Sequence, residues 1–326
     1  MKFNRKIFTD LTDQEFNAAA LTTFRFQYDQ NETYRLFADS VGAGPDKVKT
    51  VQDIPFLPIS FFKTHTLVTG THTAEKIFTS SGTTGSVKSR HAVTDLSIYR
   101  QSLLAGFQKF YGDPASYDLY ALMPSPEENP GSSLVFMVNE WRLQQGGAPD
   151  IFYLNRFEEL AERLAHPVPS GKKRLIIGLT YALLDFTEQF PMQLPGIIIM
   201  ETGGMKGRRE EMIREELHDL LINRFGVNTV HSEYGMTELL SQAWSKGEGI
   251  FYTPGWMKIL IREMNDPFSY LPGSGTGGIN IIDLANFNSC SFIATEDLGK
   301  AYSDGSFEVL GRYDNSDIRG CSLMMS

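Results

Sequence analysis

Apolar residues recur at helical spacing between residues 11 and 41, which predicts one or two helices near the start of the chain. The positions that share this spacing are Phe16, Ala19, Ala20, Phe24, Tyr28, Tyr34, Leu36 and Phe37. Residues 51–65 follow, where Pro55 and Pro58 exclude a long helix. We therefore expect residues 1–74 to form a helical and extended segment packed on the core.

Between residues 75 and 249, short apolar runs alternate with amphipathic stretches. Four of these runs predict strands: 75–81, 117–124, 174–180 and 196–202. One helix is expected to begin at a cap formed by Thr94 or Asp95 and to continue through Gln108. Another is expected over 207–223, where apolar residues share one side. The alternation predicts an α/β nucleotide-binding core with a parallel-rich sheet.

The character of the sequence changes at about residue 250, where glycine, proline and β-branched residues become more frequent. Residues 277–283 and 306–312 predict short strands, and Asp304-Gly305 is a hairpin signal. We expect a smaller β-rich subdomain over 250–326, with a short C-terminal arm. The predicted fold class is α/β: a large N-terminal α/β region followed by this subdomain.

Composition excludes several classes of protein. The chain has 326 residues, 41% of them hydrophobic, and a formal net charge of -9, so its overall field does not attract nucleic acid or an anionic membrane. The longest aliphatic run, 196–200, is too short to span a bilayer, and the N-terminus lacks the apolar stretch of a signal peptide. With two cysteines there is no disulfide scaffold, and we expect a cytoplasmic protein with a buried, structural Cys290.

The stretch FTSSGTTGSVKSRH, residues 78–91, combines hydroxyl side chains, glycines and cations. It fails the Walker pattern, but glycines let a backbone turn tightly and present N–H groups to an anion. Lys88 and Arg90 add positive charge. These residues predict a phosphate-binding loop, and the alternative interpretation is a polar surface turn.

A second glycine motif is rejected. Gly273, Gly275 and Gly278 match the dinucleotide fingerprint letter for letter. That fingerprint requires a helix after it, whereas the residues that follow predict a strand. We expect a flexible hairpin connection here instead.

Four segments, in order, resemble the motifs of the adenylate-forming enzymes: SSGTTGSVK (80–88), ETGGMKGRRE (201–210), SEYGMTE (232–238) and TEDLGKAYSDGSFEVLGRYD (295–314). Within that superfamily, IPFLPISFFKTH (54–65) and the ending RGCSLMMS resemble the LuxE-type acyl-protein synthetases. The resemblance implies an ATP-dependent acid–thiol ligase that forms AMP. Such enzymes activate a fatty acid and carry it as a thioester on a cysteine near their C-terminus.

The resemblance also implies roles for individual residues. The β- and γ-phosphates would be held by Thr79, Ser80, Ser81, Gly82, Thr83, Thr84, Gly85 and Lys88. Gly203 and Gly204 would line the nucleotide site. Tyr234 would stack on adenine beside Gly235 and Met236. Thr237 would touch the α-phosphate, Glu238 would hold Mg²⁺, Asp297 would accept from the ribose, and Arg312 would lie near it. The residues implied in catalysis are Lys88, Thr237, Glu238 and Cys321.

Each role has a structural alternative. Tyr234 could be a buried residue of the core without a ligand role. Glu238 could belong to the first turn of a helix that begins near Thr237. Asp297 could be a turn residue. The helix expected to begin about Gly207 would turn backbone N–H groups toward the ligand, whereas the neighbouring basic side chains could simply be solvated. Two residues are candidates for the acyl pocket: His231 and Met205. His91 could orient a carboxylate or a phosphate, but such a residue is more often a hydrogen-bonded wall of the pocket.

Cys321 is the candidate acyl carrier. Attack on an acyl-adenylate needs the thiolate, and an unperturbed thiol, with a pKa of about 8.5, is only slightly ionised at neutral pH. Arg319 could lower that pKa. The alternative is an inert, packed thiol.

The sequence departs from the family at its end. Full-length adenylate-forming enzymes continue after the ribose arginine with a domain that carries a catalytic lysine. Here fourteen residues follow Arg312, and the last lysine is Lys300. We expect activation of a fatty or aromatic acid to acyl-AMP with transfer to a thiol, and then to a partner protein: a reductase, a transferase or a carrier. The alternatives are a coenzyme A or carrier-protein ligase and an inactive nucleotide-binding subunit.

Overall fold

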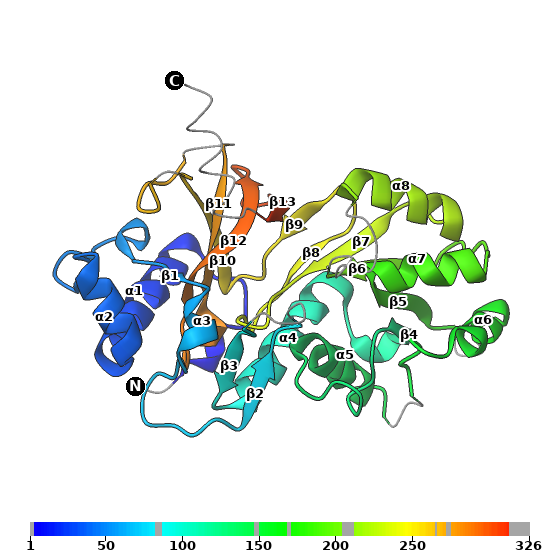
Figure 1. Cartoon of the computed structure of the whole chain (residues 1–326), viewed down its shortest axis with the longest axis horizontal. Helices are drawn as coiled ribbons and strands as arrows, with labels where there is room; N and C mark the ends of the chain where they lie inside the picture. Colours follow the sequence, from blue (N-terminus) through cyan, green and yellow to red (C-terminus); the bar gives the residue numbers. More distant parts are fainter. Residues whose placement is uncertain are drawn as a thin grey trace. The chain divides into compact units, whose positions relative to one another are not determined.

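The computed structural model describes residues 3–81, 87–146, 150–167, 171–203, 212–264, 266–271 and 275–312 (Figure 1). The chain divides into two compact units. Unit 1 comprises Met1–Ala74, Ala92–Thr94 and Tyr252–Ser326, and unit 2 comprises Glu75–His91 and Asp95–Phe251. The two units are described separately below. The division into 1–74, 75–249 and 250–326 stays a prediction.

The sheet of unit 2 is mainly parallel, as predicted. Its strands are β4 (Tyr117–Leu122), β5 (Lys173–Leu179), β6 (Ile198–Thr202), β7 (Val230–Tyr234) and β8 (Ala243–Ser245). They follow the order β8-β7-β6-β5-β4, and only the β7–β8 pair is antiparallel. Leu175, Ile176 and Ile177 are all buried, so helices must cover both faces of the sheet.

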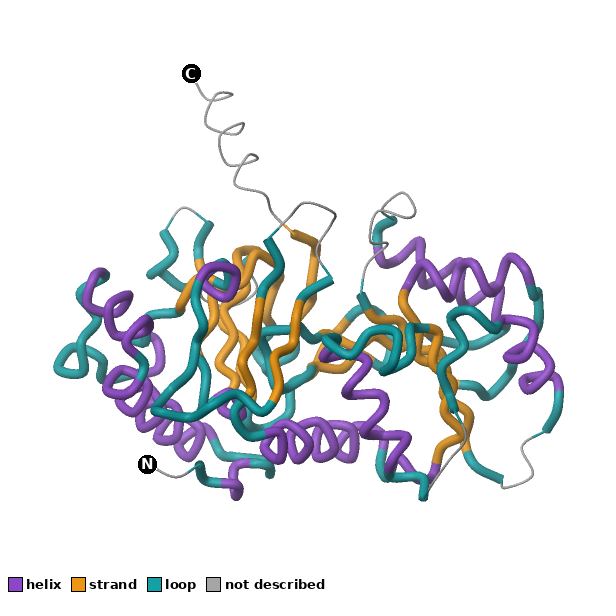
Figure 2. The backbone as a smooth tube through the Cα atoms, turned by 60° about the horizontal axis from the view of Figure 1, so that its bottom comes forward, coloured by secondary structure: helices purple, strands orange, loops and turns teal. Residues whose placement is uncertain are grey.

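Five helices surround that sheet: α4 (Leu96–Tyr111), α5 (Ser133–Leu143), α6 (Phe157–Ala165), α7 (Thr180–Gln189) and α8 (Arg214–Phe225). Helices α7 and α8 pack together on one side of the strands, and α4 and α5 form a pair on the other (Figures 1 and 2). Asp95 caps α4 by accepting from the N–H of Ser97, as predicted. The expectation of a helix from about Gly207 is wrong, because Ile213 is extended and α8 begins at Arg214.

The strand predicted over 75–81 does not join the parallel sheet. Strand β2 (Lys76–Thr79) pairs instead with β3 (Arg90–Val93) in a separate two-stranded sheet. The hydroxyl- and glycine-rich residues therefore connect the two strands of a hairpin, and do not follow a strand of the main sheet.

Unit 1 contains an antiparallel sheet built mostly from the C-terminal part of the chain. Its strands β10 (Met257–Arg262), β11 (Thr276–Asp283), β12 (Phe292–Ala301) and β13 (Phe307–Arg312) pair in sequence order. The short strand β1 (Leu57–Pro58) pairs with β12 in parallel. The predicted hairpin joins β12 to β13, with Gly305 at φ +85°. The rejection of the dinucleotide fingerprint is confirmed, because β11 follows it.

The remaining elements are short or N-terminal. The helices of unit 1 are α1 (Asp13–Gln30), α2 (Glu32–Ser40) and α3 (Phe61–Thr64). The 3-10 turns are Arg5–Ile7, Val51–Asp53, Pro114–Ser116 and Leu284–Asn286, and strand β9 is Ile250–Tyr252. A capping box between Thr12 and Glu15 starts α1. The mixed architecture confirms the predicted α/β fold class.

Helix α1 is tied to the segment between β11 and β12 by a buried glutamine. Gln27 donates through Nε2 to the carbonyl oxygens of Asn286 (3.1 Å) and Phe287 (2.9 Å). Its Oε1 accepts from the N–H of Ser291 at 3.0 Å. The rings of Phe26 and Phe287 stack beside this contact. No helix of the described residues combines the length and apolar character needed to cross a bilayer.

Candidate functional site

Two serines close the base of the predicted phosphate loop in unit 2. The N–H of Ser80 donates to the carbonyl oxygen of Ser89 (3.1 Å), and the N–H of Ser89 donates to Oγ of Ser80 (3.0 Å). Ser81 is exposed, and Thr79 and Ser80 are half-buried. Ser80 and Ser89 are therefore held next to each other by two hydrogen bonds. Gly82, Thr83, Thr84 and Gly85 lie outside the described residues.

The loop is also fixed to a residue that the sequence reasoning missed. The N–H of Thr79 donates to the carbonyl oxygen of Gly131 at 2.9 Å. A Cβ at Gly131 would lie 2.8 Å from Oγ1 of Thr79, so a larger residue here would have to displace that hydroxyl. The Pro130-Gly131 dipeptide was a turn signal in the sequence, but nothing there indicated its partner.

Lys88 follows the loop and is exposed. Within the described part of the chain it makes no ion pair, so its ammonium is available to an anion. A lysine carries a compact, mobile charge that suits phosphate oxygens. The geometry is compatible with the implied role but does not test it.

The predicted adenine motif begins at the end of β7. Tyr234 is 9% exposed and packs edge-on against Phe251, with 5.9 Å between the ring centroids. Thr237 and Glu238 then form a turn in which the N–H of Leu239 donates to the carbonyl oxygen of Met236. The interpretation of Glu238 as part of a helix beginning near Thr237 is therefore wrong. The chain turns back here to form β8, the antiparallel neighbour of β7.

A buried histidine joins the loop hairpin to the adenine motif. His91 has no exposed surface, and its Nδ1 lies 2.8 Å from the carbonyl oxygen of Thr237. Since a carbonyl can only accept, Nδ1 carries the proton. Two of the predicted segments, separated by 146 positions in sequence, therefore meet at this hydrogen bond. The interpretation of His91 as a hydrogen-bonded wall agrees with this geometry.

The predicted segment 201–210 begins at the end of β6, the neighbour of β7 in the sheet. The hydroxyl of Thr180 donates to the carbonyl oxygen of Gly203 at 2.6 Å. Gly203 is exposed and has φ +68°, a conformation that favours glycine. Gly204 and Met205 lie outside the described residues. Gly203 therefore follows the carboxyl end of a parallel strand, where ligands of α/β sheets commonly bind.

The sequence reasoning also missed Glu233, which precedes the motif tyrosine. Glu233 is half-buried, and its carboxyl accepts from Oγ1 of Thr202. Burial raises its pKa to about 7; the nearby charge of Glu201 acts in the same direction, and the hydrogen bond from Thr202 opposes it. A Cβ at Gly235 would lie 2.4 Å from its Oε1. The motif glycine therefore makes room for this carboxyl.

His231, the candidate for the acyl pocket, lies on β7. Its Nδ1 is 3.1 Å from the hydroxyl of Tyr111. Burial lowers its pKa to about 4, and the charges of Lys246 and His218 add to this shift. The imidazole is therefore neutral at neutral pH. Its role in the acyl pocket stays a prediction.

The predicted ribose residues belong to unit 1. Asp297 on β12 and Arg312 on β13 face each other in register, and Nε of Arg312 donates to Oδ1 of Asp297 at 3.3 Å. The interpretation of Asp297 as a turn residue is wrong, because it lies in the middle of a strand. The pair holds a buried carboxylate beside an exposed guanidinium.

The two cysteines differ in how far the structure describes them. Cys290 is buried and donates through its thiol to the carbonyl oxygen of Phe292. Burial raises its pKa to about 12, so the thiol stays protonated and inert. The expectation of a structural Cys290 is confirmed. Cys321 lies outside the described residues, and its role stays a prediction.

The carboxylates of the described residues form no cluster of three metal-ligating side chains. Glu238 is a single buried carboxylate, 5% exposed, at the turn beside Thr237. Mg²⁺ in nucleotide sites is commonly held by one or two carboxylates together with substrate phosphates and water. The donor set is therefore compatible with a magnesium ion that arrives with a nucleotide.

Comparisons with known proteins agree with these motifs. Residues 6–117 match the family described as "Acyl-protein synthetase, LuxE". The chain is 26% identical over 327 residues to the long-chain-fatty-acid–luciferin-component ligase of Vibrio harveyi, covering 93% of this chain and 85% of that one. The resemblance to the LuxE-type family is confirmed. The enzyme of the same description from Aliivibrio fischeri is 25% identical over 329 residues, with the same shares covered.

Solved structures support the fold. A 2-hydroxyisobutyryl-CoA ligase in complex with 2-HIB-AMP has a TM-score of 0.65 at 13% identity, covering 96% of this chain and 71% of that one. ATP-bound MatB from Rhodopseudomonas palustris has a TM-score of 0.53 at 14% identity, covering 72% and 47%. The chain thus spans less than half the length of MatB. The described residues therefore share the fold of these two ligases.

Proposed function

We propose that this protein activates a carboxylic acid with ATP and transfers the acyl group to a thiol. The observation that carries the proposal is the hydrogen bond between His91 and Thr237, which brings the loop hairpin and the adenine motif together in unit 2. Similarity to fatty-acid ligases over 93% of the chain supports it. The acid is fatty or aromatic, and the reaction takes place in the cytoplasm, where thiols stay reduced.

In the first step, a carboxylate oxygen bonds to the α-phosphorus of ATP as the bond to the bridging oxygen of pyrophosphate breaks. Pyrophosphate leaves with that electron pair, so negative charge grows on it. Lys88 and the loop hydroxyls stabilise this charge, because fixed donors need no reorganisation during the reaction. Mg²⁺, held by Glu238, would neutralise phosphate charge. Asp297 binds the ribose hydroxyls.

In the second step, a thiolate bonds to the acyl carbon and AMP leaves with the electrons of the broken acyl–oxygen bond. The mixed anhydride is what makes the carboxyl carbon reactive toward sulfur. We propose Cys321 as the first acceptor and a reductase, transferase or carrier protein as the second. Coenzyme A is the alternative acceptor. The experiment below includes it because solved ligases with this fold use coenzyme A.

Carboxylate-dependent exchange of labelled pyrophosphate into ATP tests the first step. The purified protein is assayed with fatty acids of several chain lengths and with aromatic acids, and hydroxylamine traps the adenylate. We expect exchange with at least one acid and its loss in Glu238→Gln. ATP binding without exchange for any acid would contradict the proposal and favour the inactive nucleotide-binding subunit.

Intact-protein mass spectrometry tests the acceptor. With ATP and the best acid, we expect a mass increase of one acyl group that hydroxylamine removes and that Cys321→Ser abolishes. Cys290→Ser is the matched control and should keep the adduct, because that thiol is buried. If the protein forms acyl-coenzyme A without becoming acylated itself, coenzyme A and not Cys321 is the acceptor.

A further inference from the structure

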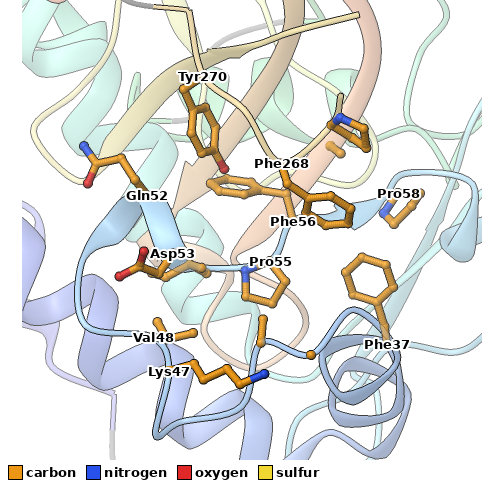
Figure 3. Close-up of a pocket in the computed structure, with 15 residues that line it drawn as sticks. Phe37, Lys47, Val48, Gln52, Asp53, Pro55, Phe56, Pro58, Phe268 and Tyr270 are labelled. Atoms are coloured by element: carbon orange, nitrogen blue, oxygen red, sulfur yellow. The ribbon is translucent and has the colours of Figure 1, made fainter. Parts of the chain in front are cut away.

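Unit 1 contains a cavity of about 370 Å³, which we name the unit 1 cavity (Figure 3). Its lining comes from α2 and the turn after it, from residues 52–58, from residues 267–270 and from Ala294 on β12. Every lining residue belongs to unit 1, whereas the loop hairpin and the adenine motif belong to unit 2. The volume falls in the range of small-molecule sites. None of the lining residues belongs to the four predicted nucleotide motifs, although Ala294 directly precedes the ribose segment on β12.

The walls are largely apolar. Phe37, Val48, Pro55 and Phe56 line the cavity together with Phe268. The ring of Phe268 is 57% exposed, an unusual position for a large aromatic side chain at the edge of a hollow. A ligand in the cavity would cover part of this ring and remove apolar surface from water.

Polar side chains line the cavity at separate positions. In Figure 3, Lys47 lies beside Val48 and Pro55, whereas Gln52 and Tyr270 lie in another part of the wall. The cavity therefore combines an apolar wall with a few separate polar side chains. Burial raises the pKa of Tyr270 to about 12, so its hydroxyl remains a hydrogen-bond donor at neutral pH.

Lys47 is the cation among the residues that line the cavity. Its ammonium lies beside Gly42, just past the end of α2, where the helix dipole favours positive charge. It has no carboxylate partner among the described residues. Lys47 lines the cavity and is exposed, so its charge is available to a ligand.

Asp53, the acidic residue that lines the cavity, already accepts hydrogen bonds from the neighbouring turn. Oδ2 of Asp53 accepts from the N–H of Lys49 (3.0 Å), and from the N–H (2.7 Å) and hydroxyl (2.9 Å) of Thr50. These bonds lower its pKa and spread its charge over the turn that it caps. Asp53 therefore accepts hydrogen bonds from the turn that it caps, and it forms no ion pair with Lys47.

We propose that the unit 1 cavity binds a small, apolar carboxylic acid, with its hydrocarbon end against Phe37, Phe56 and Phe268 and its carboxylate on Lys47. Aromatic and proline surfaces accept a hydrocarbon chain, and a carboxylate forms a charge-assisted hydrogen bond with the ammonium. The ligand is a free acid that needs neither ATP nor the adenine motif. The site is thus an acid-binding site additional to the proposed reaction.

Photolabelling locates the ligand independently of any reaction. The full-length protein is irradiated with an octanoic acid that carries an alkyl diazirine, without ATP, and the labelled peptides are mapped by mass spectrometry. We expect labels within residues 37–58 and 266–271, competed by octanoate but not by 1-octanol. Labelling confined to unit 2 peptides would overturn the proposal, while leaving the pyrophosphate-exchange result unaffected.

Variants test the cation and the apolar wall of the cavity. Lys47→Gln should weaken competition by octanoate about tenfold, which is about 1.4 kcal/mol. Lys49→Gln is the matched control, because this exposed lysine does not line the cavity, and it should leave competition unchanged. Phe268→Ser should weaken labelling at both peptides. If Lys47→Gln lowers only the melting temperature, the lysine serves helix α2 alone and the proposal fails.

Discussion

His91 shows how one buried side chain can link two distant segments. The sequence predicted a hydrogen-bonded residue at the wall of the site, and the structure identifies its partner: Nδ1 donates to the carbonyl oxygen of Thr237. The same turn carries Glu238, the implied magnesium ligand. The position of that carboxylate therefore depends on a donor that belongs to the loop hairpin.

Replacing this donor should weaken nucleotide binding as well as the fold. His91→Phe leaves a buried carbonyl without its partner, which costs about 1–3 kcal/mol of folding free energy. In the pyrophosphate-exchange assay we expect the KM for MgATP to rise about tenfold. His91→Asn, which keeps an N–H donor, should recover part of the loss.

Thr187→Val is a suitable control for that experiment, because it removes a buried hydroxyl from α7 in the same unit. It should lower stability without moving the KM for MgATP. Equal KM values in His91→Phe and the wild type would show that the histidine only fills space.

Glu233 and His231 make opposing contributions to stability. Burial raises the pKa of Glu233 to about 7, so the folded state binds its proton more tightly, and stability falls as pH rises from about 4.5 to 7. Burial lowers the pKa of His231 to about 4, so stability rises with pH between about 4 and 6.5. Over the shared window these trends offset each other.

Glu233→Gln should reveal the increase of stability with pH that the lowered pKa of His231 causes. Without the glutamate, the free energy of unfolding measured with urea should increase from pH 4.5 to 6.5 more steeply than in the wild type. The difference between the two proteins should change by about 3 kcal/mol between pH 4.5 and 7, as each pKa unit is worth about 1.36 kcal/mol. Parallel stability curves would mean that Glu233 titrates normally.

At the scale of elements, strands were easier to predict than helix boundaries. Strands β5 and β6 were visible as nearly continuous apolar runs, because a sheet covered on both faces leaves few polar positions. The start of α8 was misjudged, since Ile213 fits the apolar spacing but lies before the helix with its side chain exposed. Spacing alone does not reveal whether an apolar residue is packed.

The turn after β7 was missed for a related reason. Residues Thr237–Leu240 read as a helix start, with a carboxylate followed by two leucines. In the structure Leu239 and Leu240 are buried as the chain reverses into β8. Tertiary packing of this turn, not local propensity, determines the conformation.

Helix α1 offers a test at this scale. Gln27→Leu removes the donor to two carbonyl oxygens and the acceptor of the N–H of Ser291 while keeping a side chain of similar size. We expect a loss of about 2–4 kcal/mol in the free energy of unfolding, because buried groups lose their partners. Gln14→Leu, at an exposed position of the same helix, should change stability little.

Across the whole molecule, the motifs were visible in the sequence, whereas the contacts between distant segments were not. The loop, the adenine motif and the ribose pair were all recognisable, but Gly131 and Glu233 were not, since both act through contacts with distant residues. The loop and the adenine motif share unit 2, whereas Asp297 and Arg312 belong to unit 1. Their convergence on one nucleotide stays a prediction.

The bond from Gln27 to Asn286 has a consequence for biosynthesis. Its two ends are separated by 259 positions, so a ribosome adding about 5–20 residues per second needs roughly 10 to 50 s to deliver the second after the first. Most of unit 2, an uninterrupted stretch of chain from Asp95 to Phe251, emerges complete in that interval. The apolar face of α1 therefore stays exposed, or bound by a chaperone, until the C-terminal strands have been synthesised and pack against it.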